Sequence, residues 1–236
     1  MWWLASVAFA GIPAKEPPRE LEIGAGGFFD AGGEFMTQPT DNKDGSLTSL
    51  PFNGFAGFSP GGGIGIDFRY KGILGLEFDI VRRLQVGKSE FTINGVDFPW
   101  QIEQRATQLP LLLKLSAPIG LVHPNLFGGI EPVIPGPATT VQPGWPTGFA
   151  GPSIEAAAGS WLYLTFGLGF EFALPIEGAD LRIPFAIRLS DNPSLPESAF
   201  ERADYIMEGG QLQRIVYVSE WQYQAAITLG VWYHFL

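Results

Sequence analysis

The stretch Leu162-Tyr-Leu-Thr-Phe-Gly-Leu-Gly-Phe-Glu-Phe172 alternates strictly between large apolar residues and small or polar ones. Side chains of a β-strand point alternately to its two faces, so one face of this segment consists only of leucine and phenylalanine. The other face carries tyrosine, threonine, two glycines and a glutamate. The pattern therefore predicts a strand with one large apolar face and one face of small or polar groups.

About eight segments of the sequence carry the same alternation. Clear examples are residues 64–70, 74–80, 109–115, 181–189 and 225–235, and the glycine-rich residues 21–31 and 126–132 match more weakly. In a soluble sheet the outward positions carry many charged residues, whereas here only 16% of the chain is charged and 31 residues are glycine. A transmembrane barrel instead turns its large apolar residues to lipid and fills a narrow lumen with glycines and paired charges. The sequence matches the second arrangement.

The connections between these segments alternate in length. Residues 36–57, 87–103, 132–160 and 190–221 are predicted as long connections, and residues 70–73, 118–124 and 175–180 as short ones. Outer-membrane barrels place long loops outside and tight turns on the periplasmic side. The order therefore predicts an all-β fold over residues 21–236, an eight-stranded antiparallel up-and-down transmembrane β-barrel with both ends at the short-turn rim.

Several other classes of protein are disfavoured. Residues 132–154 are uncharged over a length that could span a bilayer, but six prolines exclude a helix there. A net charge of −10 without a basic cluster disfavours nucleic acid as a partner. The absence of cysteine excludes disulfides and thiolate metal sites. Residues 1–20 are apolar at first, with small residues at Ala8 and Ala10, and are predicted to be a signal-peptide remnant or an N-terminal tail.

Three local patterns together resemble the outer-membrane β-barrel domain family, which includes OmpA-like, OmpX-like and OmpW-like proteins. They are Gln108-Leu-Pro-Leu-Leu-Leu-Lys114, Asn125-Leu-Phe-Gly-Gly-Ile-Glu-Pro132 and Gly167-Leu-Gly-Phe-Glu-Phe172. With the closing strand they cover most of residues 21–236. The resemblance implies a location in the bacterial outer membrane and insertion by the barrel-assembly machinery. It also implies an assembly signal in the last strand, here Ile227, Leu229, Val231, Tyr233 and Phe235, although Leu236 follows where family members usually end on an aromatic residue.

Strand parity predicts a network of charges inside the lumen. Its members are Asp67, Arg69, Glu77, Asp79, Lys114, Glu131, Glu171, Arg182 and Arg188. Buried charges are costly unless they are paired and hydrogen-bonded, so ion pairs are expected. Two are predicted across short turns, between Glu171 and Arg182 and between Arg69 and Glu77.

Catalytic, cofactor and metal sites are not predicted. The two histidines, His123 and His234, are expected at the short-turn rim, away from the rim where an enzyme acting on lipid needs its base. Residues 41–46 resemble a calcium loop but lack its first and last ligands. The aromatic residues Trp100, Trp161, Trp221, Tyr70 and Tyr233 are predicted to form the interfacial girdles.

These patterns favour an integral outer-membrane protein that is not an enzyme and that serves the envelope as a structural or surface-interaction protein through its long external loops. Its lumen is expected to be plugged by side chains, with outer-membrane lipid and lipopolysaccharide around the barrel and an unknown surface partner outside. A narrow channel or small-solute carrier is the first alternative, and a lipid-modifying barrel enzyme is the second.

Overall fold

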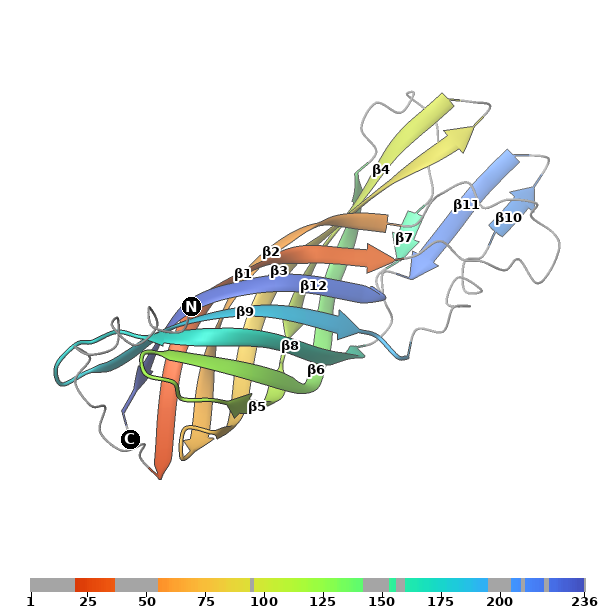
Figure 1. Ribbon diagram of the computed structural model, residues 1–236. Helices are drawn as coiled ribbons and strands as arrows, with labels where there is room; N and C mark the ends of the chain where they lie inside the picture. Colours follow the sequence, from red (N-terminus) through yellow and green to blue (C-terminus); the bar gives the residue numbers. More distant parts are fainter. Residues whose placement is uncertain are drawn as a thin grey trace, which may run out of the picture.

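The computed structural model describes residues 20–36, 55–93, 96–141, 153–155, 160–194, 205–208, 211–218 and 221–235. Its main sheet is a closed antiparallel ring (Figure 1). The strands are β1 (Leu21–Met36), β2 (Phe55–Tyr70), β3 (Leu74–Ile93), β4 (Val96–Gln108), β5 (Leu111–Ser116), β6 (Val122–Val141), β8 (Trp161–Ala173), β9 (Asp180–Asp191) and β12 (Tyr223–His234). The first strand pairs with the last, which closes the ring.

β4 and β5 share one position in the wall. Both pair with β3 and with β6, and only Leu109 and Pro110 separate them. Proline has no N–H to give to the ladder, so the predicted continuous strand over residues 109–115 is wrong in this detail and resumes at Leu111. The Pro110 carbonyl still accepts from the Asp79 N–H at 3.0 Å. Counted by wall position, the ring has eight strands, which confirms the predicted fold class.

The three predicted short connections are confirmed, and all three lie at one rim. In the tightest one Lys71 and Gly72 have φ of 53° and 66°, a left-handed geometry that glycine adopts without steric cost. The start of β1 and the end of β12 lie at the same rim, where the Phe235 N–H donates to the Ile23 carbonyl at 3.0 Å. This end of the barrel is called the short-turn rim below.

Two of the four long connections, residues 87–103 and 132–160, are shorter than predicted because β3, β4 and β6 continue past the apolar segments. β3 runs to Ile93 and pairs with β4 as far as Val96, within the predicted loop 87–103. β6 runs to Val141. A second, three-stranded sheet contains β7 (Ser153–Glu155), β10 (Tyr205–Glu208) and β11 (Gln211–Val218). Strands that leave the membrane need no apolar outer face, so period-two hydrophobicity stops before the hydrogen-bonded ladder does.

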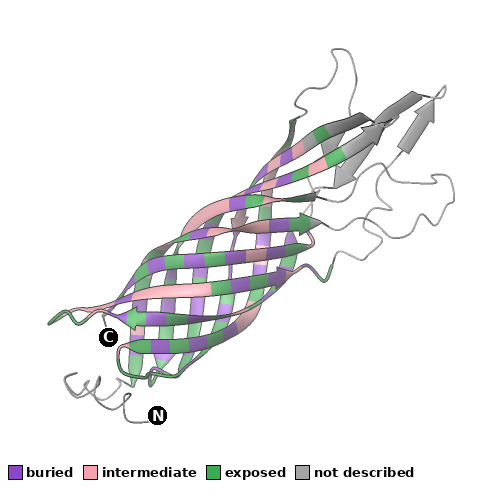
Figure 2. Ribbon diagram, turned by 45° about the horizontal axis from the view of Figure 1, so that its top comes forward, coloured by how far each residue is buried: buried purple, intermediate pink, exposed green. Residues whose placement is uncertain are grey.

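The two faces of the barrel wall are inverted relative to a soluble protein. Large apolar side chains cover the outside: Ile64, Leu126 and Leu168 are 65%, 60% and 56% exposed. Figure 2 shows exposed and buried residues alternating along the strands of the wall. The inside carries buried charged and polar groups. Among the described residues, none forms a helix long and apolar enough to cross a membrane. Membrane-spanning barrels have this apolar outer band and polar interior.

Glycines on the inner face make room for rings that enter the lumen. A Cβ added at Gly167, for example, would lie 2.4 Å from Phe127 Cζ. The ring-on-glycine pairs are Trp232 on Gly65, His234 on Gly24, Phe127 on Gly167 and Trp221 on Gly87. An eight-stranded barrel has little internal space, so a large ring on one strand requires the smallest residue on its neighbour.

Candidate functional site

All nine residues of the predicted charge network lie inside the lumen and are buried. They come from six strands: Asp67 and Arg69 from β2, Glu77 and Asp79 from β3, Lys114 from β5, Glu131 from β6, Glu171 from β8, and Arg182 and Arg188 from β9. Adjacent strands are close in space and the ring is narrow, so residues far apart in sequence meet across it. Their contacts divide into three clusters along the barrel.

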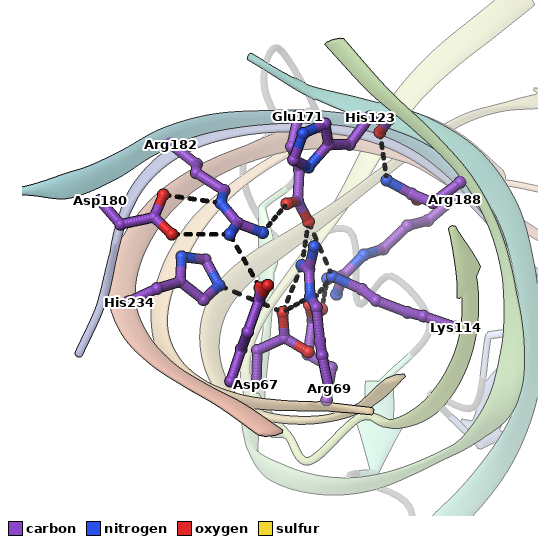
Figure 3. Close-up of polar contacts among 12 residues, drawn as sticks. Asp67, Arg69, Lys114, His123, Glu171, Asp180, Arg182, Arg188 and His234 are labelled. Carbon is purple, nitrogen blue, oxygen red and sulfur yellow. Dashed lines mark hydrogen bonds and ion pairs between the residues drawn. The ribbon is translucent and has the colours of Figure 1, made fainter. Parts of the chain in front are cut away.

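The lower cluster lies nearest the short-turn rim (Figure 3). Arg69 donates from Nε to Asp67 Oδ2 at 2.5 Å and also contacts Glu171. Arg182 pairs with Glu22 Oε2 at 2.8 Å and with Asp180 Oδ2 at 2.7 Å. Each of these two buried cations therefore has at least two acidic partners, which compensates the cost of removing it from water.

The two predicted ion pairs have different outcomes. Glu171 Oε2 lies 3.8 Å from Arg182 Nη1, as the turn between β8 and β9 predicted. The expected pair between Arg69 and Glu77 does not form, because the register of β2 and β3 places Glu77 opposite Asp67 and Arg69 opposite Gly75. Glu77 instead contacts Lys114 and Arg188.

The central cluster is built around Arg188. Its Nη2 lies 2.9 Å from Glu77 Oε1 and 2.8 Å from Asp79 Oδ2. The guanidinium carbon is also 5.5 Å from the centre of the Phe28 ring and 5.8 Å from that of Phe127. Arginine is suited to such a position because its planar group both accepts ring contacts and donates to carboxylates.

Lys114 joins the lower and central clusters. Its ammonium contacts Glu77 and lies 3.6 Å from Glu171 Oε1. It also lies 5.7 Å from the centre of the Trp232 ring. A cavity of about 20 Å³ remains beside these side chains, between Lys114, Arg188, Phe127 and Trp232. That volume holds about one water molecule.

The upper cluster contains charges that sequence reasoning missed. Arg83 contacts Asp30, and its Nη1 lies 3.4 Å from Glu34 Oε1. Thr165 donates to Glu131 Oε2 at 2.9 Å. The parity of β1 was a usable signal, since Glu22, Asp30 and Glu34 share the face of its inward glycines. Arg83 lies beyond the apolar segment 74–80, where the outer alternation no longer marks a strand.

Acidic groups outnumber basic ones in the lumen. Among the described residues, eight carboxylates and five Lys or Arg side chains are buried. Three of these carboxylates, Asp30, Glu34 and Glu131, lie in the upper cluster near one cation, Arg83. Across the described ranges, no group of three or more His, Asp or Glu is arranged to hold a metal ion.

Both histidines lie at the short-turn end of the barrel. His123 is the second residue of β6 rather than part of a turn, and its ring lies 3.2 Å from the Gly120 carbonyl. His234 ends β12, and its Nε2 is 3.6 Å from Asp67 Oδ2. Neither is near the long-loop rim, where an enzyme acting on outer-leaflet lipid needs a base.

The predicted aromatic girdle is only partly as expected. Tyr70 and Tyr233 are 53% and 46% exposed on the outer face, near the short-turn rim. Trp161 and Trp221 are wrong as girdle residues, because both are buried on the inside. Trp221 lies over Gly87, where the missing side chain leaves room for an indole. The side chain of Trp100 lies outside the described residues.

The predicted assembly signal forms a lipid-facing row on the outside of β12 and just beyond it. Its five residues are between 46% and 54% exposed: Ile227, Leu229, Val231, Tyr233 and Phe235. Residues 41–46 and residues 1–19 lie outside the described part of the chain, so the expectations for the apparent calcium loop and for the N-terminal segment stay predictions.

No protein-family model and no curated protein matches the sequence. Among solved structures, the chain is similar to Neisserial surface protein A (12% identity, TM-score 0.40, covering 92% of this chain and 98% of that one). It is also similar to the outer membrane protein OprG from Pseudomonas aeruginosa (12%, 0.41, 91% and 95%). A third is Ail, the attachment invasion locus protein of Yersinia pestis, in complex with the heparin analogue sucrose octasulfate (10%, 0.37, 91% and 99%).

The chain's own surface carries the assignment to a membrane. A closed barrel with an apolar exterior, a charged interior and tight turns at one rim is a transmembrane β-barrel of the outer-membrane type. The predicted location in the bacterial outer membrane therefore holds.

Proposed function

We propose that this protein is an integral outer-membrane barrel with a side-chain-plugged lumen, which acts as a structural or surface-interaction protein of the envelope. The packing of the central cluster carries this proposal. Arg188 and Lys114 lie across the lumen among Phe28, Phe127 and Trp232, and the cavity beside them is about 20 Å³. A space of this volume holds about one water molecule, and a hydrated ion is larger than that.

The side chains that fill the lumen support a scaffold role, because solutes then have no path through the barrel. Function would in that case lie on the long-loop side. Binding residues are often placed on loops held by a rigid scaffold. Residues 37–54 and 142–152 lie outside the described residues. Lipid and lipopolysaccharide would surround the barrel wall, and the barrel-assembly machinery would read the outward row on β12.

A planar-bilayer recording of the purified, folded protein tests the plug. We expect no stable, porin-like openings at either polarity. A matched sample of the same protein, boiled before reconstitution, controls for leaks caused by unfolded chains or detergent. Long-lived openings that require the folded form would contradict the proposal.

A narrow cation channel is the second candidate, and the excess of buried carboxylates favours it. Acidic rings select cations, and the described residues place eight buried carboxylates and five buried cations in the lumen. Glu171, which contacts Arg69, Lys114 and Arg182, is the position to test. Cation-selective openings in the parent that disappear in Glu171→Gln would establish the channel in place of the plugged scaffold.

A further inference from the structure

Two exposed arginines interrupt the apolar outer face of the barrel on β3 and β4. Along β3 the outward residues Leu74, Leu76, Phe78 and Ile80 are followed by Arg82, which is exposed, and then by Leu84 and Val86, which are half-buried. On β4 the next outward position above Thr107 is Arg105, which is also exposed. The register pairs Arg82 with Thr107 and Leu84 with Arg105, so the two arginines are diagonal neighbours on one face.

The distance of these arginines from the short-turn rim matches the thickness of the membrane's apolar layer. A strand rises about 3.3 Å per residue and tilts by roughly 35–45° in such barrels. Eight residues from Leu74 to Arg82, and ten from Leu115 to Arg105, therefore span about 20 to 25 Å along the barrel axis. The apolar band of a transmembrane barrel is about 25 Å tall. Both guanidiniums thus lie at its upper edge, on the side of the long loops.

The two arginines differ from the cations of the lumen. The buried lumen cations all form ion pairs, whereas in the described part of the chain Arg82 and Arg105 form none. Arg82 Nη1 donates to Thr107 Oγ1 at 2.5 Å, which holds its guanidinium against the wall. The outward carboxylate of Glu103 accepts from Gln101 at 2.5 Å.

Both arginines also have an open flank. The residue opposite Arg82 on β2 is Gly62, which has no side chain to cover the guanidinium. On the other side, the pairing of β4 with β6 is irregular at Arg105. The register shifts between Gln104 and Ala106 of β4, and Gly136 of β6 lies beside the Arg105 carbonyl. Irregularities of this kind redirect side chains at barrel rims.

We propose that Arg82 and Arg105 form a binding site for the phosphate groups of an anionic glycolipid in the outer leaflet. Charge complementarity selects this occupant, since two exposed guanidiniums at the headgroup level, with no ion pair to the described residues, bind phosphate oxygens through charge-assisted hydrogen bonds. We assign the site to the phosphate groups of lipopolysaccharide, the phosphorylated lipid of that leaflet. The inference rests on the proposed function, because it requires the barrel to lie in an outer membrane with its long loops outside.

The test uses the full chain folded in neutral detergent, with lipid A as the probe and native mass spectrometry as the readout. We compare the parent with Arg82→Gln/Arg105→Gln and with Lys71→Gln, which removes an exposed cation at the opposite rim. The double variant is expected to lose about tenfold or more in lipid A affinity, because two charge-assisted contacts disappear. Lys71→Gln and chemically dephosphorylated lipid A serve as controls for position and for charge.

Three results would overturn the site: parent-level binding by the double variant, an equal loss in Lys71→Gln, or equal binding of dephosphorylated lipid. The site would also be overturned if inorganic phosphate, at the same concentration as lipid A, displaced the lipid, since a lipid site gains affinity from the acyl chains. Folding is checked first by the gel shift on boiling. A parent without that shift would refute the barrel itself, and this failure is distinct from loss of lipid binding in folded protein.

Discussion

Removing the charge of Arg188 should destabilise the barrel strongly, because it leaves Asp79 without a counter-ion. Arg188 is the cation of both Glu77 and Asp79, at 2.9 and 2.8 Å. Glu77 retains Lys114, but Asp79 is fully buried and Arg188 is the only cation paired with it in the described part of the chain. Arg188→Met is the suitable change, since methionine keeps most of the volume between Phe28 and Phe127.

The magnitude follows from what the substitution leaves behind. Breaking a buried ion pair by removal of one partner costs about 3 to 5 kcal/mol, mostly from the uncompensated charge. Loss of the cation–π contacts adds about 1 kcal/mol, which the apolar methionine partly offsets. If the orphaned carboxylate is the main cause, adding Asp79→Asn should recover about 2 kcal/mol or more of that loss.

The assay is equilibrium unfolding by urea in detergent micelles, followed by the fraction of protein that shifts on a gel when boiled. The parent, Arg188→Met, Asp79→Asn and the double variant form a double-mutant cycle, which isolates the coupling between the two positions. A coupling energy below about 0.5 kcal/mol would refute the reasoning, since it would show that Asp79 does not depend on Arg188 for compensation.

Three further predictions concern the wall of the barrel. The folded protein should migrate faster than the boiled protein on a gel, because a closed barrel has no edge strand from which to unzip, and identical migration would count against closure. Leu168→Arg should lower the free energy of unfolding by about 2 to 4 kcal/mol in a urea titration in lipid, because Leu168 faces lipid near the bilayer midplane. Leu162→Arg, near the end of the strand, should lower it by only about 0 to 1 kcal/mol. Equal losses for the two variants would contradict the depths assigned to these residues of β8. Gly129→Ala should lower the free energy of unfolding by about 1 to 3 kcal/mol, because its Cβ would lie 2.0 Å from the Leu111 carbonyl oxygen. Gly128→Ala, whose Cβ has no neighbour nearer than 3.7 Å, should be nearly neutral in the same titration, and similar effects of the two would refute the packing argument.

The alternation of residues determined the fold class, the number of wall positions and the facing of the side chains within the apolar segments. It succeeded because the wall is one strand thick, with lipid on one side and a narrow lumen on the other, so parity alone decides what a residue meets. Leu168 and Glu171 could be assigned to opposite faces without coordinates. The alternation alone does not predict the extension of β3 and β4, although the sequence Asn94-Gly95 between them is a strong hairpin signal.

Only the tertiary structure decided which lumen residues touch. Parity places Arg69 and Glu77 inside, but the register between β2 and β3 sets their partners, and a shift of two residues keeps the facing while it changes every contact. The Arg188 cluster joins β3, β6 and β9 with Phe28 of β1 across the lumen, and no local pattern encodes such a meeting. Trp221 points inward for a similar reason, because Gly87 on β3 leaves the space for its indole. Facing is a property of one strand, whereas pairing across a barrel depends on closure and register of the whole ring.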